Sequence, residues 1–321
     1  MIAESAVAAL DIGGTKISAG LISRAGDLLW QRAEATAQSS LADSLDQLTN
    51  LIVEAVIHAP AHCTVAGVGL AVPGWVNRRA GTVWAPNIAG WDHIPLLREL
   101  RQRVRWPLQV DSDRNAYVLG EAWRGRAAGL EDVVFLAVGT GIGAGIISGG
   151  RLIRGRDDLA GCAGWFALQP EFQELYAWMG CLEAEASGKS LGRKAEERDF
   201  FAGRDELRGQ GARAVIEAAE HDDAAGRALL DEAAGFLGMG VANLISTLNP
   251  QMVVLGGGLF QRGEYLLAAV RRETMRWAQP MAAERVRIER STLDEHAGLY
   301  GAARIAWDEN SAGSASATGP E

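Results

Sequence analysis

The stretch AALDIGGTKISAGLIS, residues Ala8–Ser23, decides how the rest of the chain is interpreted. An apolar run ends in the acidic residue Asp11, a short glycine-containing segment follows, and a second run of alternating apolar residues begins. Apolar alternation on both sides of glycines is typical of a β-hairpin. The sequence therefore predicts a hairpin whose polar chemistry lies at its turn.

The residues of this turn are suited to binding phosphate. Gly13 and Gly14 let backbone N–H groups approach an anion without a Cβ in the way, and Thr15 and Lys16 add a hydroxyl donor and a positive charge. Asp11 would repel phosphate directly, but it can hold a hydrated Mg²⁺ that touches phosphate. The alternative is a tight hairpin with solvated charges, because a short glycine motif is a weak signal by itself.

A second stretch, Val133–Leu152, repeats the design. Its sequence VVFLAVGTGIGAGIISGGRL has an apolar strand, a turn at Gly139, Thr140 and Gly141, a returning strand and a tight turn at Gly149–Gly150. A dinucleotide-binding fingerprint needs a helix directly after its glycines, whereas here strand-like alternation continues. Two phosphate hairpins in one chain predict a duplicated architecture that closes over one nucleotide.

A third glycine run lies in NPQMVVLGGGLF, where Gly256, Gly257 and Gly258 follow a short β-branched strand. The amphipathic segment Leu259–Trp277 comes next and predicts a helix. A helix N-terminus at this point would offer unpaired N–H groups and the positive end of the helix dipole. The alternative is an ordinary strand-to-helix turn.

Composition limits the classes of function. The chain has 321 residues, which favours two domains, and a net charge of −9, which argues against a nucleic-acid surface. Its three cysteines are scattered, as in a reducing cytoplasm. The N-terminus lacks a basic leader, and no apolar run approaches the ~18 residues of a membrane span. We therefore expect a cytoplasmic protein that binds neither nucleic acid nor membrane.

The segment Gln109–Glu121 is the predicted chemical centre. A strand delivers Asp111, Ser112 and Asp113, and a helix is expected to start near Arg114. Phosphorylation of a hydroxyl needs a base on the attacking oxygen, and carboxylates between a strand end and a helix start suit a cleft. The alternative is that these residues only cap the helix.

With these stretches in place, the chain resembles the ROK family of bacterial sugar kinases and sugar-responsive repressors from Val7 to Trp307. The motifs that carry the resemblance are DIGGTK at 11–16, VPG at 72–74, APN at 85–87, DSDRNAYVLGE at 111–121, GTGIGAGII at 139–147, GCLE at 180–183, LNP with LGGG at 248–258, and AGLYGAA at 297–303. The resemblance implies an α/β, two-domain actin-like (ribonuclease H-like) ATPase fold with ATP and sugar in an interdomain cleft.

On this basis we expect an N-terminal α/β domain at 1–122, completed by a helix at about 297–308. The C-terminal α/β domain, with the second hairpin, is expected at 123–296. The polar stretch 309–321 is expected to be disordered.

The resemblance also implies residue roles. Asp113 matches the catalytic base and Asn115 is retained, while Ser112 stands where the family has a sugar-binding Asn and Arg114 where it has a small residue. The residues expected to bind nucleotide and phosphate are Asp11 (through Mg²⁺ and water), Gly13, Gly14, Thr15, Lys16, Gly139, Thr140, Gly141, Gly256, Gly257 and Gly258. The residues expected to line the substrate are Gly74, Asn87, Ser112, Asp113, Cys162, Trp165 and Glu183.

One motif departs from the family. The family has AGE-x-GH, whose Glu and His bind sugar and whose His joins three cysteines around a structural Zn²⁺. Here Cys162 and Trp165 replace the two sugar-binding residues, and only Cys181 remains of the cysteine cluster. One thiol cannot make a four-ligand site, so we expect no structural zinc. Glu183 is kept.

These observations predict a homodimeric kinase that uses ATP and Mg²⁺ to phosphorylate a hydroxyl of a sugar or sugar-like cyclitol. Two rivals stay open. One is a catalytically weak relative that binds a sugar or nucleotide as a sensor, which the lost Glu and His favour. The other is a structural or chaperone-like ATPase of the actin superfamily.

Overall fold

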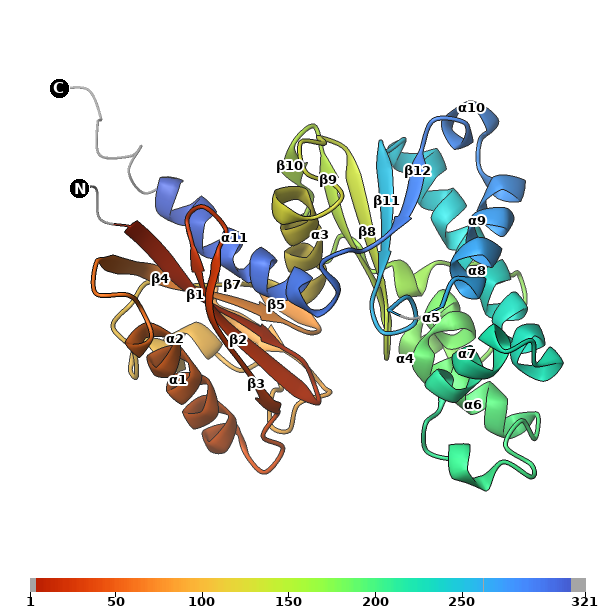
Figure 1. Ribbon diagram of the computed structural model, residues 1–321, viewed down its shortest axis with the longest axis horizontal. Helices are drawn as coiled ribbons and strands as arrows, with labels where there is room; N and C mark the ends of the chain where they lie inside the picture. The colour runs from red at the N-terminus through yellow and green to blue at the C-terminus, as the bar shows by residue number, and fades with distance from the viewer. Residues whose placement is uncertain (1–3, 262, 313–321) are drawn as a thin grey trace. The chain divides into compact units, whose positions relative to one another are not determined.

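The computed structural model describes residues 4–261 and 263–312 (Figure 1). Contacts divide the chain into two compact units. The first comprises Met1–Ala128, Arg154–Leu159 and Glu295–Glu321, and the second comprises Gly129–Ile153 and Ala160–Asp294. The short segment from Arg154 to Leu159 therefore belongs with the first unit, although the sequence analysis assigns it to the second domain.

The first unit is built on a five-stranded sheet. In chain order its elements are β1 (Glu4–Ile12), β2 (Lys16–Ser23), β3 (Leu28–Ala35), α1 (Leu41–Ile57), β4 (Cys63–Val72), β5 (Trp75–Asn77), β6 (Thr82–Trp84), α2 (Leu96–Arg101), β7 (Leu108–Ser112), α3 (Asp113–Arg124) and α11 (Ala297–Ala312). The sheet order is β3-β2-β1-β4-β7, and β5 and β6 form a separate two-stranded hairpin. The predicted first hairpin is β1–β2, paired antiparallel with Asp11 opposite Ser18.

Both faces of this sheet are covered. Alternate residues of β1 point to opposite sides, so that Ala8 and Leu10 pack in the core under α1, while Val7 and Ala9 pack against α11. Such two-sided burial explains the continuous apolar character of the strand. Ser40 caps α1, because its side chain accepts a hydrogen bond from the backbone N–H of Asp43.

The second unit repeats this sheet. Its strands are β8 (Val133–Val138), β9 (Ile142–Ser148), β10 (Arg151–Leu152), β11 (Met252–Gly256) and β12 (Arg287–Arg290), in the order β10-β9-β8-β11-β12. Like β3-β2-β1, the first three form an antiparallel meander, and like β4 and β7, β11 and β12 continue in parallel. The shared order confirms the predicted duplication.

Helices cover this second sheet. They are α4 (Tyr176–Met179), α5 (Cys181–Ala186), α6 (Gly188–Glu197), α7 (Ala212–Glu220), α8 (Ala224–Leu248), α9 (Tyr265–Trp277) and α10 (Pro280–Ala283), with short 3-10 turns η1 (Ala163–Trp165), η2 (Asp205–Leu207) and η3 (Asp294–His296). Two glycines of α8 allow close packing against neighbouring helices. A Cβ at Gly238 would lie 2.5 Å from Cβ of Glu273, and one at Gly240 2.8 Å from Leu182, whereas Gly235 faces open space.

α8 comes nearer to a membrane-spanning composition than the sequence analysis expects. An 18-residue window within it has a mean hydropathy of 1.3, but 61% of that window is buried inside the protein. Its apolar residues belong to the core of the second unit, among them Leu230, Leu237 and Val241. Core helices of globular units commonly pass a test of length and composition alone.

Two predicted boundaries are wrong. α9 begins at Tyr265, so the helix does not start directly after the third glycine run as expected from Leu259. The intervening residues turn back instead, since the backbone N–H of Leu259 donates to Val138 O and that of Phe260 to Gly257 O. At the C-terminus α11 continues to Ala312, beyond the expected end at 308, and the rest of the expected tail, 313–321, lies outside the described residues.

Candidate active site

The turn of the first hairpin is closed by its own backbone. The N–H of Gly13 donates to Lys16 O at 2.9 Å, and the Thr36 hydroxyl, from the residue after β3, donates to Gly13 O at 2.7 Å. The predicted phosphate ligand Lys16 forms an ion pair of 2.6 Å with Glu295. Both side chains are about half exposed, so this pair is weak and Lys16 remains exchangeable between partners.

Gln38 joins this turn to Asn87. Its carboxamide donates to Gly14 O at 2.5 Å and accepts from the N–H of Ala89 at 3.1 Å. A predicted phosphate residue and a predicted substrate residue are thereby brought side by side: a Cβ at Gly14 would lie 3.1 Å from Cβ of Asn87. The sequence analysis missed Gln38, because nothing in its local sequence marks it.

Asp113 occupies the first position of α3, directly after β7. Its Oδ1 accepts a hydrogen bond of 2.7 Å from the N–H of Arg114. Burial raises the pKa of the Asp113 carboxyl to about 6, against the lowering effects of the Arg114 charge and of this hydrogen bond. A carboxylate with this pKa is ionised at neutral pH and still basic enough to take a proton.

The neighbouring Asp111 has a structural role. It is 1% exposed, and its Oδ1 accepts from the N–H of Ser112 at 2.8 Å and from the Asn115 carboxamide at 2.7 Å. Its Oδ2 lies 2.8 Å from Nε of Arg154 and 3.5 Å from Nε of Arg78. Both oxygens are therefore engaged in fixing the β7–α3 junction, which favours Asp113 over Asp111 as the base.

Asp11, at the end of β1, lies close to this centre. Burial raises the pKa of its carboxyl to about 7, with a further increase from the Asp113 charge and a decrease from Lys16. Oδ2 of Asp11 rests against α11, where a Cβ at Gly298 would lie only 2.1 Å away. A glycine at 298 is therefore required for Asp11 to hold this position.

Tyr117 is a residue of this centre that the sequence analysis did not single out. It follows Asp113 by four residues on α3, on the same helix face. Burial and the charges of Asp11 and Asp113 raise the pKa of its hydroxyl well above the usual value. The sequence does place a tyrosine one helical turn after a candidate base, but this spacing alone matches no functional motif.

Arg114 and Gly74 are also in contact. The Arg114 guanidinium donates to Gly74 O at 3.3 Å and to Asp158 O at 3.1 Å. Arg114 is only 8% exposed, so a buried cation stands immediately beside Asp113. Gly74 has a φ of +82°, which explains the glycine at this sharp turn after β4.

In the second unit, Glu183 of α5 supports the turn of the second hairpin. Its Oε2 accepts from the N–H of Ile142 at 2.7 Å, and a Cβ at Gly141 would lie 2.7 Å from the same oxygen. The N–H of Gly139 closes the turn by donating to Gly141 O at 2.9 Å. Burial raises the pKa of the Glu183 carboxyl, opposed by the Ile142 hydrogen bond and the charge of Lys189.

The segment that departs from the family lies beside Glu183. Cys162 is half-buried and Trp165, at the end of η1, is 56% exposed. Among the described residues there is no group of three or more His, Cys, Asp or Glu that could hold a metal ion. The region is instead crossed by a buried ion network, in which Lys194 contacts Glu185 at 2.5 Å and Glu232 at 2.8 Å.

The third glycine run follows β11. Gly256 is the last residue of the strand, and Gly257 has a φ of +86°, with its Cα close to the backbone of Val138 at the end of β8. The run is therefore a tight turn beside the second hairpin rather than the N-terminus of a helix.

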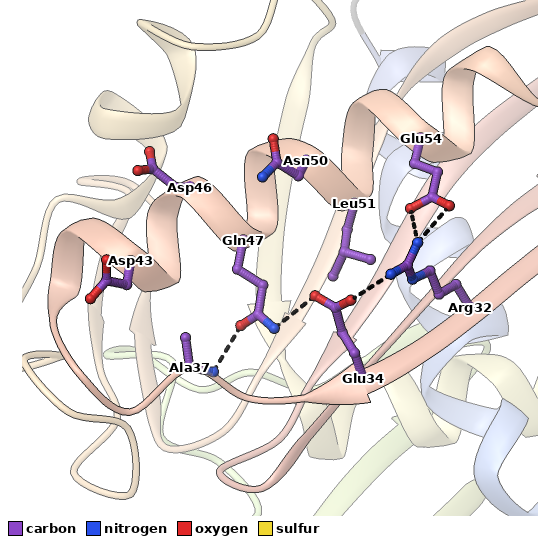
Figure 2. A pocket seen from close by; sticks show the side chains of 9 residues that line it. All are labelled: Arg32, Glu34, Ala37, Asp43, Asp46, Gln47, Asn50, Leu51 and Glu54. Carbon is purple, nitrogen blue, oxygen red and sulfur yellow. Dashed lines mark hydrogen bonds and ion pairs between the residues drawn. The ribbon is translucent and has the colours of Figure 1, made fainter.

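A cavity of about 400 Å³ lies elsewhere in the first unit, between β3 and α1 (Figure 2). Its lining residues are Arg32, Glu34, Ala37, Asp43, Asp46, Gln47, Asn50, Leu51 and Glu54. The charges inside it are largely paired, since Arg32 contacts both Glu34 and Glu54 (Figure 2). None of the predicted site residues lines this cavity.

Comparison with known proteins gives a consistent result. The model of the ROK family matches residues 7–309. A glucokinase of Thermotoga maritima is 31% identical over 92% of this chain and 95% of its own, and a glucokinase of Halalkalibacterium halodurans is 29% identical over 91% and 92%. A putative xylose repressor of Caldicellulosiruptor is 30% identical over 91% of this chain and 75% of its own.

Solved structures agree. A ROK hexokinase from Thermus thermophilus superposes with a TM-score of 0.79 at 32% identity, covering 96% of this chain and 99% of that one. A ROK-family glucokinase from Streptomyces griseus, solved with glucose and AMPPNP, gives 0.77 at 32% identity, covering 94% and 98%. These likenesses confirm the predicted two-domain actin-like α/β fold.

Proposed function

The chain belongs to the ROK family, and from that premise we propose that it is a kinase that uses ATP to phosphorylate a hydroxyl of a sugar or sugar-like cyclitol. The observation that carries this proposal is the position of Asp113, a half-buried carboxylate at the junction of β7 and α3. Its surroundings raise the pKa of this carboxyl to about 6. Phosphoryl transfer depends on positioning and charge neutralisation, with a base on the attacking hydroxyl. In the proposal Asp113 takes that proton.

The substrate hydroxyls would be held around Asp113. The hydroxyl of Ser112 is buried and has no hydrogen-bond partner among the residues described, which supports a contact with the substrate. Gly74 and Asn87 complete this side of the proposed sugar site. The family resemblance also assigns Cys162, Trp165 and Glu183 to sugar binding.

Asp11 fits a role in holding Mg²⁺. Burial and the nearby Asp113 charge both oppose ionisation of its carboxyl, and a cation relieves this cost. Mg²⁺ commonly binds proteins through one or two carboxylates, with water and phosphate as its other ligands. Held there, it would neutralise charge on the transferred phosphoryl group.

The phosphates of ATP are assigned to the two hairpin turns. Gly13, Gly14, Thr15 and Lys16 offer donors in the first. Gly139, Thr140 and Gly141 offer them in the second. The third glycine run, Gly256, Gly257 and Gly258, would border the adenosine. It would contact the nucleotide through a tight backbone turn, not through the N-terminus of a helix.

A second candidate function is a sugar sensor with weak catalysis. The thiol of Cys162 and the indole of Trp165 supply weaker hydrogen bonds than the Glu and His of the family pattern. The similarity to a putative xylose repressor is consistent with a sensing branch of the family. Phosphoryl transfer to a small molecule, as opposed to sugar binding or plain ATP hydrolysis, distinguishes the two.

The test is an ADP-release screen across sugars, aminosugars and cyclitols, with product identified by mass. We expect turnover on one substrate class and at least ~10-fold lower kcat/KM for glucose, because each buried hydroxyl left unpaired costs ~1–3 kcal/mol. Trp165→His should move the preference toward glucose. Glucose as the best substrate of the wild type would overturn the specificity argument, and no transfer to any acceptor would overturn the kinase.

The proposal also includes a cytoplasmic homodimer without structural zinc. Sedimentation of the purified chain would test the dimer. Elemental analysis would test the zinc.

A further inference from the structure

A cavity of about 240 Å³ lies in the first unit, between the β5–β6 turn, α2 and β7. Its lining residues are Arg78, Arg79, Leu97, Gln109 and Val110. The two arginines lie in the turn between β5 and β6, Leu97 is on α2, and Gln109 and Val110 are on β7. β7 is the edge strand of the five-stranded sheet in the described part of the chain.

The polar lining of the cavity consists of hydrogen-bond donors and one carboxamide. No carboxylate lines it. Arg79 is exposed and makes no ion pair or hydrogen bond within the described part of the chain. Leu97 and Val110, which are 5% and 3% exposed, give the cavity an apolar wall. The two arginines supply positive charge and N–H donors suited to a phosphate, and the apolar wall matches a carbon skeleton.

We propose that this cavity binds a small organic phosphate monoester as an effector. The volume admits a phosphate on a short carbon skeleton. It is distinct from the phosphate-binding turns, because none of the residues assigned to ATP or sugar lines it.

Arg78 links the cavity to the base. Its Nε is 3.5 Å from Oδ2 of Asp111, whereas Nε of Arg154 is 2.8 Å from the same oxygen. Arg78 is therefore the weaker of the two partners of Asp111. Burial and the charge of Arg154 lower the pKa of Arg78, whereas the charges of Asp111 and Asp158 raise it. An added anion would act on the guanidinium in the same direction as these two carboxylates.

A phosphate in the cavity competes with Asp111 for Arg78. Asp111 keeps Arg154 and its bonds to Ser112 and Asn115, but loses one of the contacts that fix the β7–α3 junction. Asp113 is the next residue after Ser112. Occupancy of the cavity thus changes how firmly the junction that holds Asp113 is fixed. This coupling rests on the proposed kinase function, whereas binding of the phosphate to the cavity does not.

Binding is tested by calorimetry on the full chain with glycerol 3-phosphate, inorganic phosphate and glycerate, all in saturating AMPPNP so that the catalytic phosphate turns are filled. Glycerol 3-phosphate should bind most tightly. Arg79→Gln should weaken it about tenfold, because a charge-assisted contact is lost. Arg101→Gln, which removes the charge of an exposed arginine on α2, is the matched control and should leave binding unchanged.

Three results would overturn the site: no binding of glycerol 3-phosphate, equal weakening by both variants, or binding of glycerate or inorganic phosphate at least as tight. Coupling is measured separately, as a change of twofold or more in kcat/KM for the sugar on adding glycerol 3-phosphate, present in Arg101→Gln and absent in Arg79→Gln. Binding without this change overturns the coupling alone. Because calorimetry needs no turnover, failure of the kinase proposal would be recognised independently.

Discussion

Replacing Asp113 with asparagine should make the protein more stable and nearly inactive. Asparagine keeps the shape of the side chain and can still accept the 2.7 Å hydrogen bond from the N–H of Arg114. It removes the negative charge that burial disfavours. Loss of a general base is worth ~10²–10⁴ in rate, so phosphoryl transfer should fall by at least ~10²-fold while ATP binding is kept.

The gain in stability follows from the pKa. The Asp113 carboxyl has a pKa of about 6 in the folded protein, against an ordinary pKa of 3.8 for an aspartate. Because the folded pKa is the higher one, the native state binds the proton more tightly, and the stability this provides is complete below 3.8 and lost as pH rises through about 6. The shift of about two units corresponds to at most about 3 kcal/mol in the free energy of unfolding. Asparagine should therefore stabilise the protein at pH values well above the folded pKa and make no difference in acid.

Thermal unfolding at alkaline and acidic pH measures this effect, with Asp92→Asn as the control because Asp92 is exposed. We expect an increase of several degrees in Tm for Asp113→Asn at the higher pH alone, and no change in the control. In the wild type, kcat/KM should decline as pH falls toward the pKa of about 6. An Asp113→Asn protein that melts no higher than the control at alkaline pH, or that keeps wild-type turnover, would refute the reasoning.

Three further results are expected. Gly298→Ala should cut kcat by tenfold or more without loss of Tm, since the new Cβ would lie 2.1 Å from Oδ2 of Asp11 and alanine favours the helix; unchanged kcat would show that Asp11 needs no fixed position. Glu183→Ala should raise KM for both ATP and sugar, because the N–H of Ile142 loses its acceptor. Glu183→Gln keeps an acceptor oxygen and should restore only the KM for ATP. Identical effects of the two changes would contradict the idea that Glu183 supports the turn of the second hairpin. Chelators should leave Tm unchanged, and one tightly bound zinc per chain in elemental analysis would count against the expected lack of a zinc site.

The strands and hairpins were predictable because their signals are local. Alternating apolar residues and glycine turns mark β1–β2 and β8–β9 directly in the sequence, and both hairpins are found. The start of α9 was not predictable in this way. The residues after Gly258 are held by a contact with Val138, more than a hundred positions earlier in the chain, which overrides the amphipathic pattern.

The same distinction applies to the site. The sequence offered Asp111 and Asp113 as neighbouring carboxylates, and motif position alone favoured one. The structure separates them physically, because Arg78 and Arg154 arrive from distant segments to engage Asp111. Gln38 was missed for a similar reason, since its three backbone partners, on Gly14, Asn87 and Ala89, belong to other loops.

The repeated sheet order has a consequence for how this protein tolerates change. In the first unit Asp11 lies near the end of β1 and Asp113 directly follows β7, whereas in the second unit Val138 ends β8 and Ser291 directly follows β12. At these strand ends the first copy carries acidic side chains, whereas the second carries an apolar side chain and a hydroxyl. Genetic lesions that alter charge should accordingly inactivate the protein mostly through one copy, while lesions that add bulk at a turn should be damaging in either.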